Sequence, residues 1–420
     1  MVESHANSVD DYLIEGLSFK LSPGASYVTN RRSVSFFPSG SDTYSSTSGV
    51  KVIKIKLNGT DWLDPSTVKV MFTINNVTTT MNFLSGVHSF FRRLRVVCNG
   101  QIVEDIDDYN RVCEMFNMLQ SSSVRTNDEI EAVSRWDGGT QETLDAGKSR
   151  KVGMKLCSGL LNQTKMLPIR YCPLEIELEL VNAVGDAQDG SIAWTISDVQ
   201  LKADLCTLDN ALENSYAKHL FEGKALPINY STYISQSQTV TDFNFNVNVA
   251  RAVTRLKSIF VSMTGAPHNS FNTKLKEFNN FWHPMSSETT AGTYNEGKEV
   301  ELHVQIGSKL YPEYPIRSAS ESFSQLRKTM GIHQSPFHSL DINGLQYRSY
   351  KFIASIDTEK VLEAGFTGLN TRAGDLMTVK VKPIDSSSGG MASLQPIKFF
   401  TVLHSDNIME IRESGITVFD

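Results

Sequence analysis

The sequence predicts an all-β chain folded as two tandem sandwich domains. Three observations support this prediction. β-prone runs bounded by turn residues recur roughly every ten residues. A hairpin followed by a helix occurs once in each half of the chain. Strands do not alternate with helices, which argues against a parallel sheet covered by helices. The 420 residues suffice for two domains, each with a core of its own.

The clearest local signal lies in residues 87–120, which begin as a hairpin. Residues 94–98 are β-prone, and Asn99-Gly100 is the dipeptide that most easily adopts the positive φ angles of a type I′ turn. Residues 101–106 then alternate, as a half-buried strand does. The expected faces are Ile102, Glu104 and Ile106 on one side, and Val103 and Asp105 on the other.

A helix is expected directly after this hairpin. Asp107 or Asp108 can cap its first turn. Apolar residues then follow at the spacing of one helical stripe, which predicts one buried face. They are Val112, Met115, Phe116 and Leu119.

The second half repeats this unit in weaker form. Residues 300–306 and 309–316 are β-prone and flank Gly307-Ser308, and Ser320 is the expected helix cap. Gly331 lies where a glycine commonly ends a helix. The expected helical stripe is Phe323, Leu326, Arg327 and Met330.

Two pairs of glycines recur at almost the same offset. Gly100 and Gly307 are 207 residues apart, and Gly159 and Gly368, each before a strand, are 209 apart. Glycine beside strands is common, so chance is the alternative explanation. We interpret the spacing as a duplicated domain of about two hundred residues.

The remaining elements complete two eight-stranded jelly-roll sandwiches with short inserted helices and long surface loops. We expect a corner at 61–65, a surface loop at 121–150 and a connecting helix at 209–222. Further strands are expected at 33–37, 49–57, 68–74, 152–156, 166–170, 174–181, 192–205, 228–234, 240–249, 256–264, 347–356, 376–381, 397–403, 409–411 and 416–419. The expected domains are an N-terminal arm (1–20), a first jelly roll (21–208), a helical connector (209–223) and a second jelly roll (224–420).

Composition narrows the function classes. The net charge is −6 and no block of Lys and Arg is present, so sequence-specific or packaging contacts with nucleic acid are not expected. Residues 1–16 lack the features of a secretory signal, and no apolar run approaches the length of a membrane-spanning helix. The odd number of cysteines, none in a CxxC pair, favours free buried thiols: Cys98, Cys113, Cys157, Cys172 and Cys206.

No catalytic motif is recognisable, so we expect no enzymatic activity, no cofactor and no catalytic, cofactor-binding or metal-binding residues. Three groups of acidic or histidine residues have structural explanations. Glutamates at alternate positions of one strand are too far apart for one ion, and acidic residues before a helix are explained by capping. A histidine pair five residues apart is more often structural. The candidates are Glu175, Glu177 and Glu179; Asp105, Asp107 and Asp108; and His333 and His338.

Three segments resemble one protein family. They are SYVTNRRSVSFFPSGSDTYSS (26–46), GTDWLDPSTVKVMFTINN (59–76) and HSFFRRLRVVCNGQIVEDIDDYNRVCEMFNML (88–119), and TGLNTRAGDLMTVKV (367–381) is also similar. They resemble the double jelly-roll major capsid proteins of polinton-like viruses and their relatives among adenoviruses, virophages and tailless membrane-containing phages. The matching motifs are architectural, so no active-site residue carries over.

The resemblance implies the major capsid protein of a double-stranded DNA virus, located in the virion and assembled inside the host cell. It implies a homotrimer that looks hexagonal and tiles an icosahedral shell, with penton and minor capsid proteins as further partners. Loops 121–150 and 265–295 would form outer towers and intersubunit contacts, and the N-terminal arm would lie inside, near DNA or a membrane. The alternative is a carbohydrate-binding or carbohydrate-cleaving double jelly roll, because sandwiches host those functions too.

Overall fold

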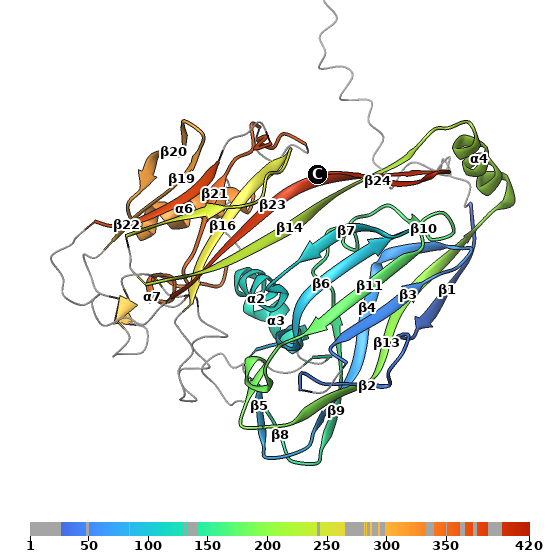
Figure 1. The fold of residues 1–420 in the computed structure, drawn as a ribbon, viewed down its shortest axis with the longest axis horizontal. Helices are drawn as coiled ribbons and strands as arrows, with labels where there is room; N and C mark the ends of the chain where they lie inside the picture. Colours follow the sequence, from blue (N-terminus) through green and yellow to red (C-terminus); the bar gives the residue numbers. More distant parts are fainter. Residues whose placement is uncertain are drawn as a thin grey trace, which may run out of the picture.

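The structure is a computed structural model, and its fold is mainly β (Figure 1). Figure 1 shows two β sandwiches side by side, with a helix between them. The structure describes residues 27–47, 50–83, 85–128, 131–132, 142–241, 244–264, 281, 283, 286–287, 293–294, 299–332, 340–349, 351–361, 366–372, 376–384 and 397–420.

The first sandwich consists of two facing antiparallel sheets. In the larger sheet, β1 pairs with β13 and β13 pairs with β4. Both β9 and β10 pair with β4, and β2 pairs with β13. The facing sheet has the strand order β3-β11-β6-β7. The larger sheet contains β1 (Val28–Phe36), β2 (Thr43–Tyr44), β4 (Trp62–Asn76), β9 (Ser149–Lys155), β10 (Leu167–Pro168) and β13 (Trp194–Leu208). The facing sheet contains β3 (Val52–Leu57), β6 (Phe91–Cys98), β7 (Gln101–Ile106) and β11 (Leu174–Leu180).

Smaller elements close the first sandwich. A three-stranded sheet has the order β12-β5-β8. Its strands are β5 (Met81–Phe83), β8 (Thr143–Leu144) and β12 (Gln188–Asp189). The helices are η2 (Val87–Phe90), α2 (Tyr109–Leu119), α3 (Ser122–Asp128) and η3 (Val184–Asp186).

The second sandwich has the sheet orders β14-β23-β16-β21, with β24 on β23, and β15-β22-β19-β20. The first sheet contains β14 (Leu226–Val240), β16 (Leu256–Thr264), β21 (Ile353–Asp357), β23 (Ile397–Arg412) and β24 (Gly415–Phe419). The second contains β15 (Phe245–Val249), β19 (Val300–Ile306), β20 (Lys309–Ile316) and β22 (Met377–Pro383). The remaining elements are β17 (Ser286–Ser287), β18 (Thr293–Tyr294), α6 (Ala319–Thr329) and α7 (Gly344–Ser349).

The two sandwiches have the same topology. In the first sandwich β1 pairs with β13, β13 with β4, and β4 with β9. In the second, β14 pairs with β23, β23 with β16, and β16 with β21, so the strand orders correspond. In the facing sheets, β3-β11-β6-β7 corresponds to β15-β22-β19-β20, and α2 and α6 follow corresponding hairpins. The duplication predicted from the glycine spacing is therefore confirmed, as is the double jelly-roll fold.

Each sandwich has an apolar core between its sheets. Alternation puts apolar side chains inward along β11 and β22, whose odd and even positions differ in burial. Phe72 of β4 meets Phe91 of β6 edge-on, with ring centroids 5.4 Å apart. In the second sandwich, Phe245 of β15 and Phe399 of β23 also meet edge-on across the two sheets, with ring centroids 5.1 Å apart. Each such side chain contributes about 1.5–3 kcal/mol through burial.

The predicted helix at the midpoint of the chain is α4 (Asn210–Phe221). The side chain of Asp209 accepts a hydrogen bond from Ala211 N, and Gly223, at φ +77°, follows its end. Leu212 and Tyr216 pack on a small cluster at the end of the first sandwich. The helix thus covers one end of the β4–β13 pair of the first sandwich; the domain boundaries stay a prediction.

The first hairpin is confirmed, but one face of it differs from the prediction. Asn99 and Gly100 both have positive φ, and β6 pairs with β7. A bulge between Val96 and Val97 shifts the pairing, so Ile102 is 52% exposed while Val103 is buried. The expected alternation was therefore wrong at this strand.

The helix after this hairpin has the predicted buried stripe but not the predicted side-chain cap. Asp108 occupies the capping position of α2 with φ +45°, and its side chain makes no capping hydrogen bond. In the second unit, Ser318 and not Ser320 caps α6, by accepting a hydrogen bond from Glu321 N. Gly331, at φ +70°, follows the helix as predicted.

Three further expectations are corrected. Residues 62–65 of the expected corner lie within β4, because a bulge between the pairs of Lys202 and Asp204 accommodates the bend inside the strand. Tyr347 belongs to α7, and the strand begins only at Ile353. The segment 121–150 contains α3 and β8, although part of it lies outside the described residues.

Candidate functional site

Buried hydrogen bonds and stacked rings join the two sandwiches at the junction between them. Figure 1 shows α2 between them and the ends of β14, β23 and β24 above β7. β7 and β14 are both edge strands of their sheets, and they contact each other. The junction therefore covers two strand edges whose backbone groups would otherwise be open to another chain.

The bulge of β7 is the centre of this contact. The Tyr230 hydroxyl of β14 donates a hydrogen bond of 2.9 Å to the Val103 carbonyl, and this bond is buried. The Ser235 hydroxyl donates to the Asp107 carbonyl. Both bonds join a side chain of the second sandwich to backbone of the first. Burial raises the pKa of Tyr230, so it remains a donor at all ordinary pH values.

Glu104 supports the bulge from the first sandwich. Its buried carboxylate accepts hydrogen bonds from Gly159 N at 2.9 Å, Leu160 N at 3.3 Å and the Ser158 hydroxyl. These donors favour the charged carboxylate, but burial outweighs them and raises the pKa of Glu104. The carboxylate thus fixes the 158–160 loop beside β7.

That loop meets the second sandwich by direct backbone contact. A Cβ atom added to Gly159 would overlap the carbonyl oxygen of Ser231. The Ser231 hydroxyl donates to Asp406 Oδ1 at 2.6 Å, and Asp406 Oδ2 accepts from Phe366 N at 3.1 Å. Ser231, whose carbonyl oxygen Gly159 faces, is therefore linked by hydrogen bonds through Asp406 to the segment before Gly368.

The two glycines of the repeated motif serve related purposes. A Cβ at Gly368 would lie 2.5 Å from the Arg255 backbone, where Leu369 and Leu256 exchange hydrogen bonds of 2.8 and 2.9 Å. Both glycines thus permit close backbone approach. Gly368 does so within its own sandwich, whereas Gly159 does so across the junction.

An aromatic cluster extends the junction below the bulge. Phe116 of α2 lies 4.6 Å from the ring of Tyr233 and 5.4 Å from that of Phe260. His404 stacks on Tyr233 at 4.9 Å. Burial and the nearby Lys257 lower the pKa of His404 to about 4, so it is neutral at pH 7.

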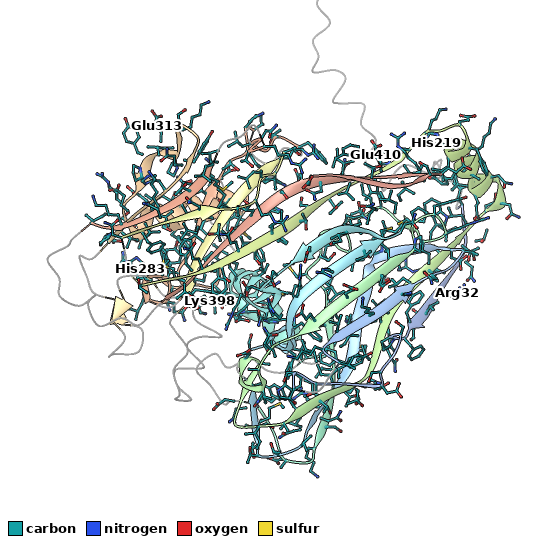
Figure 2. All side chains as sticks on the ribbon, viewed as in Figure 1. Arg32, His219, His283, Glu313, Lys398 and Glu410 are labelled. Atoms are coloured by element: carbon teal, nitrogen blue, oxygen red, sulfur yellow. The ribbon has the colours of Figure 1, made fainter. Side chains whose placement is uncertain are left out.

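Two ion pairs also join the first half of the chain to the second half. Lys398 of β23, labelled in Figure 2, lies 3.6 Å from Asp108 at the start of α2. Arg125 of α3 lies 3.5 Å from Asp341. Such partly exposed pairs contribute about 0–1 kcal/mol each, so the buried hydrogen bonds and rings carry the contact.

The acidic residues considered for metal binding have basic partners instead. Glu177 pairs with Lys54 and Arg95, and Glu175 lies 4.0 Å from both Lys54 and Lys56. Arg93 binds Asp105 through two bonds of 2.7 and 2.6 Å. No group of three or more metal-ligating side chains occurs among the described residues, and His333 and His338 lie outside them.

One buried cluster has the residue types of a hydrolytic triad. Glu114 Oε2 lies 2.5 Å from the Ser85 hydroxyl and 2.9 Å from His88 Nε2. In a working triad, the serine and the carboxylate bind opposite nitrogens of the imidazole. Here both contact Nε2, and Asn117 lies beside Nδ1 at 3.4 Å. The arrangement therefore stabilises the turn before β6 and cannot relay a proton to a nucleophile.

The structure also bears on the expectations for the cysteines and for membrane-spanning helices. All five cysteines are free, and only Cys157 among them is not fully buried. In the described part of the chain, no helix is long and apolar enough to cross a bilayer.

Sequence reasoning did not identify the junction residues as a functional group. The sequence predicts Phe116 and Glu104 only as members of a helix stripe and a strand face, and no local pattern marks Tyr230, Tyr233 or His404. The only available signal was the repeated glycine motif, because Gly159 requires a neighbouring backbone.

Comparison with known proteins identifies the fold. No protein-family model matches the sequence. No curated protein matches it either. Among solved structures, PBCV-1 VP54, fitted into a reconstruction of the virophage Sputnik, matches with a TM-score of 0.63 at 13% identity, covering 96% of this chain and 99% of its own.

Two further structures match along almost their whole length. The Faustovirus major capsid protein has a TM-score of 0.59 at 8% identity and covers 97% of this chain and 94% of its own. The mavirus major capsid protein has a TM-score of 0.51 at 12% identity, covering 100% and 95%. The likeness spans both sandwiches and their junction, so this chain shares the complete double jelly-roll fold.

Proposed function

We propose that this protein is the major capsid protein of a double-stranded DNA virus, located in the virion and without enzymatic activity. The observation that carries the proposal is the junction. It joins two sandwiches of one topology through an edge strand of each, so a single chain presents two similar units in a fixed succession. Two solved structures named as major capsid proteins match this chain along nearly their whole length, which supports the proposal.

We further propose that three copies form a ring of six similar units. A head-to-tail contact repeated around a closed ring gives cyclic symmetry, and three copies of a duplicated unit approximate a hexagon. Such a tile can pack on a quasi-hexagonal lattice using one kind of protein. Penton and minor capsid proteins are the expected further partners, because a closed shell also needs fivefold positions.

Light scattering coupled to size-exclusion chromatography tests the assembly. The expected mass is that of three 46.7 kDa chains. A monomeric mass at high protein concentration would contradict the proposal. The described residues provide no feature that favours the carbohydrate alternative, and a glycan array with a hydrolase screen checks it.

A further inference from the structure

The intrachain junction has a counterpart that the described part of a single chain leaves uncovered. β7 of the first jelly roll and β14 of the second meet at the junction, and each is an edge strand. By the shared topology, the counterpart of β7 is β20, and the counterpart of β14 is β1. β20 and β1 are also edge strands. β20 belongs to the second sandwich, whereas its counterpart β7 belongs to the first; β1 belongs to the first sandwich, whereas its counterpart β14 belongs to the second. A second copy of the chain would be needed to bring them together.

Both open edges have the exposure expected of an uncovered contact. β20 bulges where its pairing with β19 passes from Tyr311 to Ile316, just as β7 bulges at Val103. Tyr314 lies in the β20 bulge and is 83% exposed, and Leu310 is also exposed. β1 is exposed along residues 28–33, whereas β14 alternates between exposed and buried residues where it crosses the junction.

The two edges lie at opposite ends of the molecule. Figure 2 shows Glu313, beside Tyr314, at one end on the second sandwich and Arg32 of β1 at the other end on the first. Within one chain they cannot meet. The edges of β20 and β1 lie at opposite ends and correspond to the contacting strands β7 and β14. A contact between β20 of one copy and β1 of the next would therefore be a head-to-tail interface.

We propose that the β20 bulge of one copy docks on β1 of a second copy, reproducing between chains the contact that β7 and β14 make within the chain. The inference rests on the proposed capsid assembly and specifies its intersubunit surface. Tyr314 is the expected anchor, because tyrosines that become buried at the centre of an interface contribute strongly to affinity. Arg32, which pairs with Asp61 but keeps a 57% exposed side chain, has remaining donors that suit an acidic neighbour such as Glu313.

The first test is a substitution that leaves the monomer intact. Tyr314→Ser is expected to weaken trimer formation by about tenfold or more, measured by light scattering over a dilution series. The fold of the monomer should be unaffected, because the Tyr314 side chain is 83% exposed. Ile192→Ser is the matched control: Ile192 is 76% exposed, lies between β12 and β13 and belongs to neither β1 nor β20, so the trimer should be unchanged.

The second test is proximity. A chain carrying Asn30→Cys and Tyr314→Cys should give covalent dimers and trimers with a short bis-maleimide, whereas each single variant and the pair Ile192→Cys with Tyr314→Cys should not. A trimer that resists Tyr314→Ser and gives no Asn30–Tyr314 cross-link overturns this interface but leaves the capsid proposal standing. A wild-type protein that remains monomeric overturns both.

Discussion

The Tyr230 hydroxyl donates a hydrogen bond to the Val103 carbonyl across 2.9 Å, joining residues 127 positions apart in the sequence. Val103 belongs to a bulge in β7, and Tyr230 to the strand that begins the second sandwich. The bulge turns a backbone carbonyl toward the neighbouring unit. The junction is thus made from an irregularity in one edge strand and a side chain of another.

The backbone contact at Gly159 predicts a strong effect of a single methyl group. Gly159→Ala should destabilise the protein by about 2 kcal/mol or more, because the added Cβ would overlap the Ser231 carbonyl unless the sandwiches separate. Urea denaturation measures the change. Gly344→Ala is the control: nothing lies within 4 Å of its added Cβ, and in α7 alanine should be neutral or slightly stabilising. Equal effects of the two substitutions would contradict the close contact.

The aromatic cluster predicts that Phe116 couples the sandwiches. Phe116→Ala removes a ring that contacts Tyr233 and Phe260, and should cost about 2–4 kcal/mol. Because the lost contacts join two cores, calorimetry should show the unfolding transition broadening or separating into two. Phe221→Ala, at a 72% exposed position of α4, should change little. A single sharp transition at the wild-type temperature would argue against the coupling.

His404 predicts weakening of the junction in acid. Its folded-state pKa of about 4 lies below the unfolded value of about 6.5, so its contribution is complete above pH 6.5 and is lost as the pH falls toward 4. The loss between about pH 7.5 and about pH 5 should be about 2 kcal/mol. His404→Phe keeps a ring against Tyr233 and should flatten this part of the stability profile. An unchanged slope in the variant would exclude His404 as its source.

Glu104 predicts a pH effect of the opposite sign. Burial raises its folded pKa above the unfolded value, so the folded state retains the proton more strongly. Wild-type stability should therefore gain from Glu104 as the pH falls from the folded pKa toward about 4.3. Glu104→Gln cannot titrate, so the wild type should become more stable relative to the variant over this range. Parallel denaturation series at several pH values measure the difference, and a constant difference would contradict a raised pKa.

Local rules were sufficient for much of the fold. The positive φ preference of Asn99-Gly100 placed the first turn, and the alternation of glutamates with apolar residues identified β11 and its buried face. The helix stop at Gly331 followed from its ability to adopt φ +70°. These features depend on neighbours in sequence, so the sequence alone reveals them.

The features that could not be predicted depend on distant residues. Ile102 is exposed and Val103 buried because a bulge shifts the β6–β7 register, and Val103 faces a strand from the other sandwich. The Asp64-Pro65 corner is absorbed into β4 because β13 continues past it as a partner. The junction residues are scattered through the chain, so no local pattern marks them as one group.

Three copies of this chain should form a six-sided particle. Electron microscopy of the purified protein tests this directly. Class averages should show a ring of six similar lobes with threefold symmetry, alternating between first and second jelly rolls. Averages that show isolated two-lobed particles, or rings with another number of lobes, would contradict the account.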